Sequence, residues 1–119
     1  MTWKLFLDDE RNPADVTWAD YKMQQKYRDD EWVICRTHDE VTQKVDELGF
    51  PDFVSFDHDL GDFVNGTGYI VAKYLVDLDM YTDISMPSNF AFFVHSKNPI
   101  GKANIEGYLN GYLKHRDEN

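Results

Sequence analysis

The stretch Val54-Ser55-Phe56-Asp57-His58-Asp59-Leu60-Gly61 decides the fold of this chain, because a short apolar run in it stops at two carboxylates with an imidazole between them. A short run of this kind is typical of a strand covered on both faces, as in a parallel sheet. In open sheets of that class, ligands bind beyond the carboxyl ends of the strands, where Asp57, His58 and Asp59 stand. The alternative is a polar turn with ordinary capping aspartates, since a lone Asp-x-Asp is a weak motif. The other strand ends of the chain bear on this choice.

Length and composition limit the class of protein. The chain has 119 residues, which suits one domain over residues 1–119, and its hydrophobic content of 42% disfavours a disordered chain. The formal net charge of -10 disfavours non-specific binding to duplex DNA or to an anionic membrane. A single cysteine, Cys35, excludes a disulfide framework and permits a reducing compartment. Because the N-terminus soon reaches the charged cluster Asp8-Asp9-Glu10, a signal peptide is not predicted, and we expect a soluble cytoplasmic protein.

The sequence predicts that strands and helices alternate along the chain. Apolar segments predict strands at Trp3–Leu7, Glu31–Arg36, Phe53–Phe56 and Phe90–Val94, the last as a buried central strand. Capping residues and apolar spacing predict helices from Thr37 to Gly49, from Thr67 to about Asp79 and from Asn98 to about Leu113. Residues 14–30 indicate only an irregular or short helix, and Lys114–Asn119 a frayed tail. The alternation predicts an α/β fold, a three-layer α/β/α arrangement with a parallel sheet of about four or five strands.

Some local patterns make finer predictions. Thr37 and Glu40 form a capping-box pattern, in which each side chain binds the backbone amide of the other residue. Asn65-Gly66 is a turn signal before the second of the predicted helices. That helix is expected to direct a set of apolar side chains inward: Ile70, Val71, Tyr74, Leu75 and Leu78.

Polar side chains follow three of the predicted strands, namely Asp8 and Asp9, then Asp57, His58 and Asp59, then His95, Ser96 and Asn98. If these strands are neighbours, the side chains converge at one edge of the sheet. Carboxylates at close range repel one another, so either some stay protonated or a hard divalent cation neutralises them. Oxygen ligands favour Mg²⁺ or Mn²⁺, and the histidines keep a softer metal open. For Asp8-Asp9 a solvated turn is the alternative.

The two histidines at strand ends are candidates for proton transfer. Imidazole is the side chain best suited to exchange protons near neutral pH, so one of His58 and His95 could activate water and the other protonate a leaving oxygen. Each could instead merely satisfy a strand-end carbonyl. Their equivalent positions, each just beyond a predicted buried strand, favour the catalytic interpretation.

Other side chains near the same edge could bind an anion. Arg11 can grip a phosphate through two donors, or it can pair with Glu10 or Asp9 instead. Asn98 is a good N-cap, and the backbone amides behind it can receive an anion. Asn104 lies near the first turns of the last predicted helix and could face the site.

Four motifs occur in order along the chain: Leu5-Phe6-Leu7-Asp8-Asp9-Glu10-Arg11-Asn12-Pro13, Ser55-Phe56-Asp57-His58-Asp59-Leu60-Gly61, Thr67-Gly68-Tyr69 and His95-Ser96-Lys97-Asn98-Pro99-Ile100-Gly101-Lys102-Ala103-Asn104-Ile105. Together they resemble the cyclic-phosphate-processing receiver-like domains of bacteria and their phages. The resemblance implies a receiver (flavodoxin-like) fold whose acidic pocket matches Asp8, Asp9 and Asp57. It also implies action on a cyclic phosphate, such as a nucleotide or an RNA 2',3'-cyclic end.

The resulting hypothesis is a metal-dependent phosphoesterase that opens a small cyclic phosphate. The predicted metal ligands are Asp8, Asp9 and Asp57, the predicted catalytic residues are His58, His95 and Asp59, and the predicted phosphate-binding residues are Arg11, Ser96, Asn98 and Asn104. The expected cofactor is Mg²⁺ or Mn²⁺, and the expected partner is a small phosphorylated ligand or an RNA end. The oligomeric state stays open.

Two other classes of function remain. A receiver-type regulator would take up phosphate at Asp57, although His58 and Asp59 crowd that carboxylate. Signalling receivers also carry a lysine after a fifth strand, whereas Lys97 follows the fourth predicted strand here. A non-catalytic acidic binding module would bind its ligand without turnover, and an exposed Trp18 would favour it.

Overall fold

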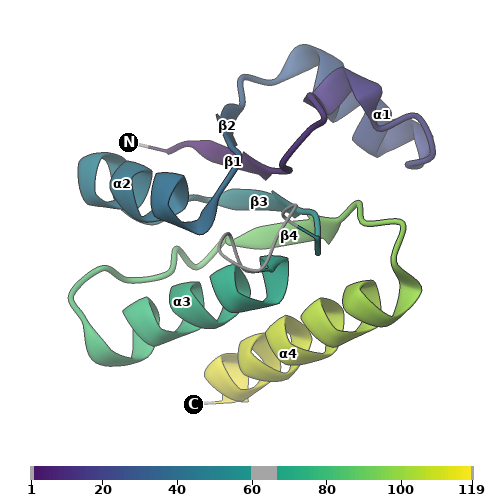
Figure 1. Ribbon diagram of the computed structural model, residues 1–119. Coiled ribbons are helices and arrows are strands. Elements are labelled where there is room, and N and C mark those ends of the chain that lie inside the picture. Colours follow the sequence, from purple (N-terminus) through teal and green to yellow (C-terminus); the bar gives the residue numbers. More distant parts are fainter. Residues whose placement is uncertain (1, 60–66, 119) are drawn as a thin grey trace.

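Strands and helices alternate in the computed structural model of this protein, which describes residues 2–59 and 67–118 (Figure 1). The elements in order are β1 (Lys4–Leu7), the 3-10 helix η1 (Pro13–Asp15), α1 (Tyr21–Asp29), β2 (Val33–Cys35), α2 (His38–Leu48), β3 (Phe53–Phe56), α3 (Gly68–Tyr81), β4 (Ala91–Val94) and α4 (Pro99–Glu118). The turn predicted at Asn65-Gly66 lies outside the described residues.

The sheet is parallel throughout the described part of the chain. It has four strands in the order β2-β1-β3-β4. Leu7 is in register with Cys35 on one side and with Phe56 on the other, and Phe56 is in register with Val94. The predicted α/β fold with a parallel sheet is confirmed. Because β1, β3 and β4 are neighbours that end in register, the residues that follow them lie at one edge of the sheet.

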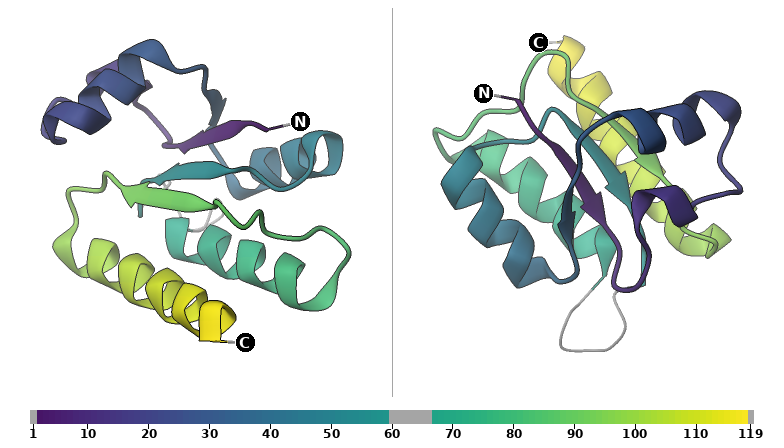
Figure 2. Two further views of the ribbon diagram at one scale, coloured as in Figure 1. Left: turned by 180° about the vertical axis from the view of Figure 1, so that it is seen from behind. Right: turned by 90° about the horizontal axis from the view of Figure 1, so that it is seen from above.

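Helices cover both faces of the sheet (Figures 1 and 2). One face packs against α2, α3 and α4 through a large apolar core that includes Leu5, Leu7, Val54, Phe56, Val41, Leu75 and Ile105. The other face packs against α1 and the segment before it through a smaller cluster of Phe6, Val16, Ala19, Met23 and Tyr27. Each large side chain that is fully buried in this way stabilises the fold by roughly 1.5–3 kcal/mol.

The last strand and the last helix differ from their predictions. β4 is an edge strand of the described sheet, not a central one, and Phe92 and Phe93 are only half-buried. Its apolar sequence reflects packing on two faces, because Phe92 contacts Phe56 in one layer and Phe93 packs against the smaller cluster in the other. The predicted frayed tail is also wrong as far as Glu118, where α4 ends. Basic side chains in its last turn, His115 and Arg116, favour the helix through its dipole.

The uncertain segment before β2 forms a regular helix. In α1, Met23 and Tyr27 are buried four residues apart, and Asp20 caps the helix by accepting a hydrogen bond from the amide of Met23 at 2.9 Å. In α3, by contrast, Ile70 is 46% exposed and so does not face inward as predicted, whereas Val76 is buried.

The start of α2 shows only half of the predicted capping box. Thr37 accepts a hydrogen bond from the amide of Glu40 at 3.1 Å, as expected of an N-cap. Glu40, however, accepts from the amide of Arg36 at 2.9 Å instead of from that of Thr37. No helix within residues 2–59 and 67–118 combines the length and the apolar character that crossing a bilayer requires.

Two glycines differ sharply in what surrounds them. A Cβ added at Gly68 would lie 1.8 Å from the carbonyl oxygen of Asp57, so only glycine allows α3 to start this close to the end of β3. A Cβ added at Gly107 in α4 would meet nothing within 4 Å.

We therefore expect Gly107→Ala to raise the free energy of unfolding by about 0.5–1 kcal/mol, because alanine restricts the unfolded chain and favours helix. Gly68→Ala should lower it by about 1–3 kcal/mol through overpacking against the backbone. Urea denaturation followed by circular dichroism measures both. Equal effects of the two substitutions would contradict the described packing.

Candidate functional site

Asp8, the residue after β1, is a fully buried carboxylate at the centre of the site. Its Oδ1 accepts hydrogen bonds from the backbone amides of Glu10 and Arg11, both at 2.9 Å. Its Oδ2 lies 3.0 Å from His95 Nε2 and 3.3 Å from Arg11 Nη1. Burial by itself would raise the pKa of Asp8, but the hydrogen bonds from His95 and the two amides hold that pKa well below its usual value. Asp8 is therefore an anion whose oxygens are both engaged.

The pKa of Asp57, the residue after β3, is shifted in the opposite direction to that of Asp8. The residue is 5% exposed, and its Oδ1 accepts a hydrogen bond from the amide of His58 at 2.8 Å. Its Oδ2 is 3.9 Å from Arg11 Nη1. Burial, followed by the negative charge of Asp8, raises the pKa of Asp57. Arg11 therefore compensates the charge of ionised Asp57 only in part, and a cation could supply the remainder.

Asp8, Asp57 and His95 could together hold a metal ion. Each offers one ligand atom, and these atoms all lie within 4.8 Å of one another. Two carboxylates favour a hard divalent cation, whereas the imidazole also suits a softer metal. Asp9, a predicted ligand, is not part of this buried group. It is half-buried and lines the adjacent cavity, so its role as a ligand stays a prediction.

A buried hydrogen-bonded chain, which we call the relay, leads from Asp8 through His95 and Ser55 to Tyr27. His95 Nδ1 lies 2.7 Å from Ser55 Oγ, and Ser55 Oγ lies 2.6 Å from the Tyr27 hydroxyl. The imidazole is 1% exposed and stacks on Phe6 with 4.7 Å between ring centres. Because anionic Asp8 can only accept, His95 donates from Nε2, and in the neutral imidazole Nδ1 then accepts from Ser55. The relay thus fixes the ring orientation of His95.

His58 and Asp59 form a second pair beyond β3. His58 Nδ1 lies 2.9 Å from Asp59 Oδ1, and the side chain of Asp59 is much more exposed than that of His58. The His58 ring lies against the first turn of α4, since a Cβ added at Gly101 would come within 2.3 Å of it. Glycine at position 101 therefore makes room for the imidazole beside the site.

Two cations near the site, Arg11 and Lys97, lie over the ring of Trp18. Arg11 pairs with Asp8 at 3.3 Å, and its guanidinium carbon is 5.0 Å from the centre of the Trp18 ring. Lys97 Nζ is 4.3 Å from the same ring. Trp18 Nε1 donates a hydrogen bond to the carbonyl oxygen of His95 at 2.9 Å. The sequence links an exposed Trp18 only to a non-catalytic binding module, and the weak periodicity of its segment does not place it at this edge of the sheet; the residue is 38% exposed.

Arg36, just after β2, was also missed. Its guanidinium donates to the carbonyl oxygen of Asp8 at 3.1 Å, to that of Arg11, and to Asn12 Oδ1 at 2.8 Å. These bonds hold the loop that carries Asp8 and Arg11 against the sheet. The signal that could have identified Arg36 is its place as the last residue of the predicted strand Glu31–Arg36, because the ends of the other three predicted strands carry the site residues.

The predicted phosphate-binding residues on α4 and before it occupy distinct places. Ser96 Oγ accepts a hydrogen bond from the amide of Asn98 at 3.1 Å. Asn98 Oδ1 accepts from the amides of Ile100 and Gly101 at 3.1 and 3.0 Å, so these amides are already engaged within the helix cap. Asn104 is exposed on α4 and is not among the side chains that line the cavity.

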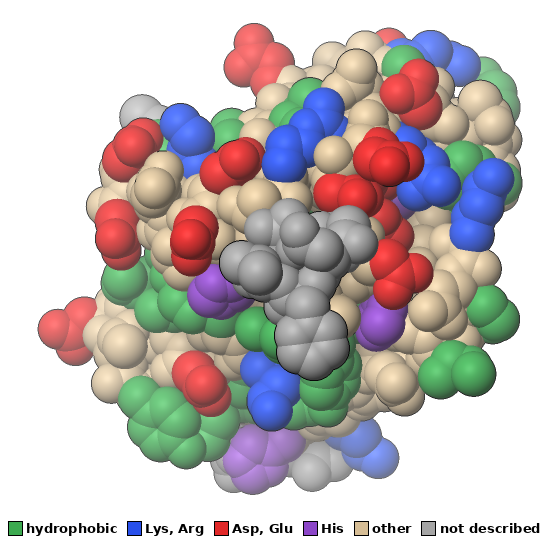
Figure 3. Space-filling model, viewed as in Figure 1, with side chains coloured by type: hydrophobic (Ala, Val, Ile, Leu, Met, Phe, Trp, Pro, Cys, Tyr) green, Lys and Arg blue, Asp and Glu red, His purple; other side chains and the backbone are tan. Residues whose placement is uncertain are grey.

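A cavity of about 230 Å³ lies at this edge and is lined by Asp9, Glu10, Arg11, Asp57, Asp59, Ser96, Lys97 and Asn98. Figure 3 shows acidic side chains gathered in the upper half of one face of the molecule, with Lys and Arg side chains between them.

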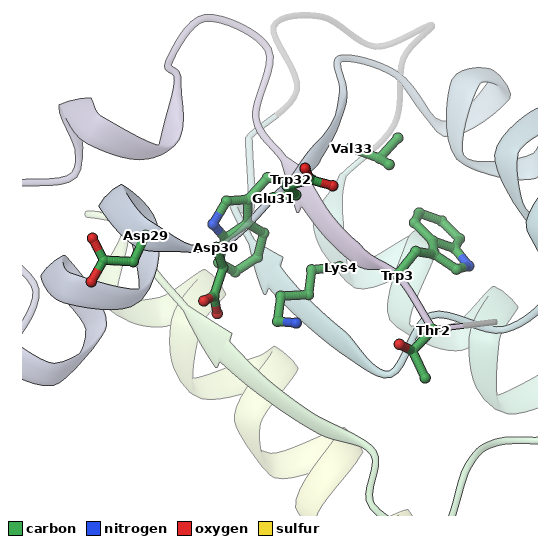
Figure 4. Close-up of a pocket in the computed structure, with 8 residues that line it drawn as sticks. All are labelled: Thr2, Trp3, Lys4, Asp29, Asp30, Glu31, Trp32 and Val33. Carbon is green, nitrogen blue, oxygen red and sulfur yellow. The ribbon is translucent and has the colours of Figure 1, made fainter.

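A second cavity of about 440 Å³ is lined by Thr2, Trp3, Lys4, Asp29, Asp30, Glu31, Trp32 and Val33, near the amino ends of β1 and β2 (Figure 4). Parallel α/β sheets bind ligands at the carboxyl ends of their strands, so the smaller cavity is the candidate site.

The chain matches a known protein family over most of its length. A family model described as cyclic-phosphate processing receiver domain matches residues 3–111, which include each side chain of the candidate site described above. No curated protein and no solved structure matches the chain.

The two buried carboxylates should affect stability in opposite directions. Without metal, Asp57→Asn is expected to raise the free energy of unfolding near neutral pH, because the raised pKa of Asp57 makes its ionisation oppose folding. This gain should vanish below about pH 4, where the aspartate is protonated in both states. Asp8→Asn should lower the free energy of unfolding by about 1–3 kcal/mol at neutral pH.

The sign for Asp8 follows from its depressed pKa. Its contribution is present above about pH 4 and is lost as the pH falls through its lower folded-state pKa. Urea denaturation across a pH series measures both variants. A shift of the same sign for Asp8→Asn and Asp57→Asn at neutral pH would contradict the described electrostatics.

The relay makes a separate prediction. Ser55→Ala should cost about 1–3 kcal/mol of unfolding free energy, because it leaves His95 Nδ1 buried without its donor. Tyr27→Phe should cost less, about 1 kcal/mol, since Ser55 keeps its bond to His95. Tyr21→Phe is the matched control, because Tyr21 belongs to the same helix but is 75% exposed. Nitrogen-15 spectra of the histidines should show His95 protonated at Nε2, and protonation at Nδ1 alone would contradict the direction of the relay.

Proposed function

The chain belongs to the cyclic-phosphate-processing receiver domain family, and on that premise we propose that it is a metal-dependent phosphoesterase that opens a small cyclic phosphate. The observation that carries the proposal is one of position. The buried group of Asp8, Asp57 and His95 lies at the same sheet edge as the His58–Asp59 pair. Groups for holding a cation and a group for moving a proton are thus adjacent.

Asp8 and Asp57 are the proposed ligands of a divalent cation, with His95 and Asp9 as further candidates. The donor set fits such an ion, because burial and the charge of Asp8 raise the pKa of Asp57, and a cation would offset both effects. A bound Mg²⁺ or Mn²⁺ would supply positive charge that polarises the phosphoryl oxygens. For His95 to join through Nε2, its proton must move to Nδ1, and Ser55 must then accept where it now donates.

His58 is the proposed proton carrier. Ring opening adds water to phosphorus and breaks one ester bond of the ring, which gives a phosphate monoester and a free hydroxyl. Asp59 orients the imidazole by accepting from Nδ1, which leaves Nε2 to take a proton from the attacking water and return one to the leaving oxygen. A direct proton-transfer role for His95 stays a prediction, and its two engaged nitrogens favour a positioning role.

Arg11, Ser96 and Asn98 line the cavity and are the proposed phosphate contacts. Arg11 is the strongest of them, because a guanidinium binds phosphate oxygens through two parallel donors. Asn104 keeps its proposed phosphate role, although it is not one of the residues that line the cavity. The proposed partner is a small phosphorylated ligand or an RNA end.

The proposed compartment is the cytoplasm, where thiols stay reduced. Cys35 is 1% exposed, and burial raises the pKa of its thiol to about 11. A thiol of this kind is inert, which agrees with a structural role for the residue.

The test is incubation of the purified protein with Mg²⁺ or Mn²⁺ and a panel of nucleoside 2',3'-cyclic phosphates, with the monoester product followed by phosphorus-31 NMR. His58→Ala should reduce kcat by about 10²–10⁴-fold, the usual contribution of a general acid–base group. Chelation of the metal should also abolish turnover. His38→Ala is the matched control and should leave the rate unchanged, because the His38 ring packs against Tyr74 of α3, whereas the His58 ring pairs with Asp59 of the cavity lining.

Turnover that survives in a His58→Ala, His95→Ala double variant would contradict the proposed proton transfer. The other two classes predict different products in the same assay. A receiver-type regulator would gain one phosphate at Asp57 from a small phosphodonor, seen by intact mass and absent in Asp57→Ala. A binding module would return the cyclic ligand unchanged with every metal tested.

A further inference from the structure

We infer that Trp18 is a stacking platform for an aromatic base at the rim of the cavity, so that the ligand is a nucleoside or oligonucleotide cyclic phosphate, not a base-free one. The inference rests on the proposed function and deepens it by naming the substrate class. Base stacking on aromatic side chains is a common way for proteins to hold single nucleotides.

Trp18 is exposed but held in place. It lies between η1 and α1 and is 38% exposed, whereas Trp3 is buried in the core at 7%. Its indole nitrogen donates to the carbonyl oxygen of His95 at 2.9 Å. The ring is therefore tied to the same residue whose imidazole contacts Asp8, which fixes the distance between the ring and the buried carboxylates.

The ring borders the cavity through two of the side chains that line it. Arg11 lies over the ring at 5.0 Å, and Lys97 lies over it at 4.3 Å. Lys97 is exposed and its side chain is flexible, so an incoming base can replace the Lys97 ammonium group on the Trp18 ring. The displaced ammonium then remains within reach of the ligand's phosphate. Arg11, in contrast, is retained by its pair with Asp8.

The size and polarity of the cavity leave the base outside it. Its volume of about 230 Å³ is below the roughly 300–1,000 Å³ of pockets that enclose whole small-molecule ligands. All its lining residues are polar or charged, so an aromatic ring gains nothing by entering. The cavity suits a phosphate and part of a sugar. Trp18 offers beside it the apolar face that the lining lacks.

Stacking also suits the charge of this protein. With a net charge of -10, the chain cannot rely on general attraction for phosphate backbones. Contact between a base and an indole ring does not depend on that attraction. A short ligand with one terminal base is therefore favoured over a long strand.

The test compares two ligands that share a five-membered cyclic phosphate, adenosine 2',3'-cyclic phosphate and the base-free glycerol 1,2-cyclic phosphate. Calorimetry with Mg²⁺ present measures binding in a His58→Ala background, which prevents consumption of the ligand. Trp18→Ala should weaken adenosine ligand binding about tenfold and change glycerol ligand binding by less than about twofold. Trp18→Phe should keep most of the affinity for the adenosine ligand. Tyr21→Ala, which removes an exposed aromatic of α1, is the control and should change neither.

Equal weakening of both ligands would overturn the inference, because Trp18 would then act only by holding Arg11 and Lys97. Unchanged binding of both ligands in Trp18→Ala would overturn it as well, while leaving the proposed function intact. If neither ligand binds with Trp18 present, the proposed function fails and the inference with it. Should Trp18→Ala fail to fold, Trp18→Leu keeps apolar bulk without an aromatic face and is expected to give the same selective loss.

Discussion

A buried anion, Asp8, is the constraint on which the rest of the site depends. A carboxylate taken out of water must find its partners inside the protein, because an uncompensated buried charge costs several kcal/mol, on the order of the whole stability of a domain. The chain meets this demand with two loop amides, the imidazole of His95 and the guanidinium of Arg11. Arg36 in turn holds the loop that supplies those amides.

The hydrogen bonds that stabilise Asp8 extend to further side chains across the sheet. His95 binds Asp8 through one ring nitrogen, so its other ring nitrogen needs a hydrogen-bond partner. Ser55 of β3 is that partner, and Ser55 in turn bonds to Tyr27 of α1. Asp57 remains the less compensated carboxylate, and its ionisation opposes folding. Storing unfavourable charge where a cation could bind is a common compromise between stability and function. The same burial that weakens the fold thus produces a group of side chains that could hold a cation.

The arrangement differs from a phosphorylation switch in what surrounds Asp57. His58 and Asp59 follow it directly and form a pair that can orient a proton carrier. Lys97 follows β4 and lies over Trp18, and among the described strands no fifth one is present. Chemistry on a bound phosphoester accounts for these residues better than transfer of phosphate to Asp57 does.

The sequence by itself determined the alternation of strands and helices, and with it the edge of the sheet at which Asp8, Asp57 and His95 lie, whereas the tertiary structure decided that β1, β3 and β4 are neighbours. Apolar runs and capping residues are local signals, and parallel strands bring their carboxyl ends together without further information. Only the tertiary structure decided the pairings, such as His95 in the buried group instead of Asp9, Tyr27 on Ser55, and Trp18 on the carbonyl of His95. Each of these pairings joins residues that are far apart in the chain. The contacts depend on the register of the strands and on the path of residues 12–20, and neither can be predicted from the local periodicity of the sequence.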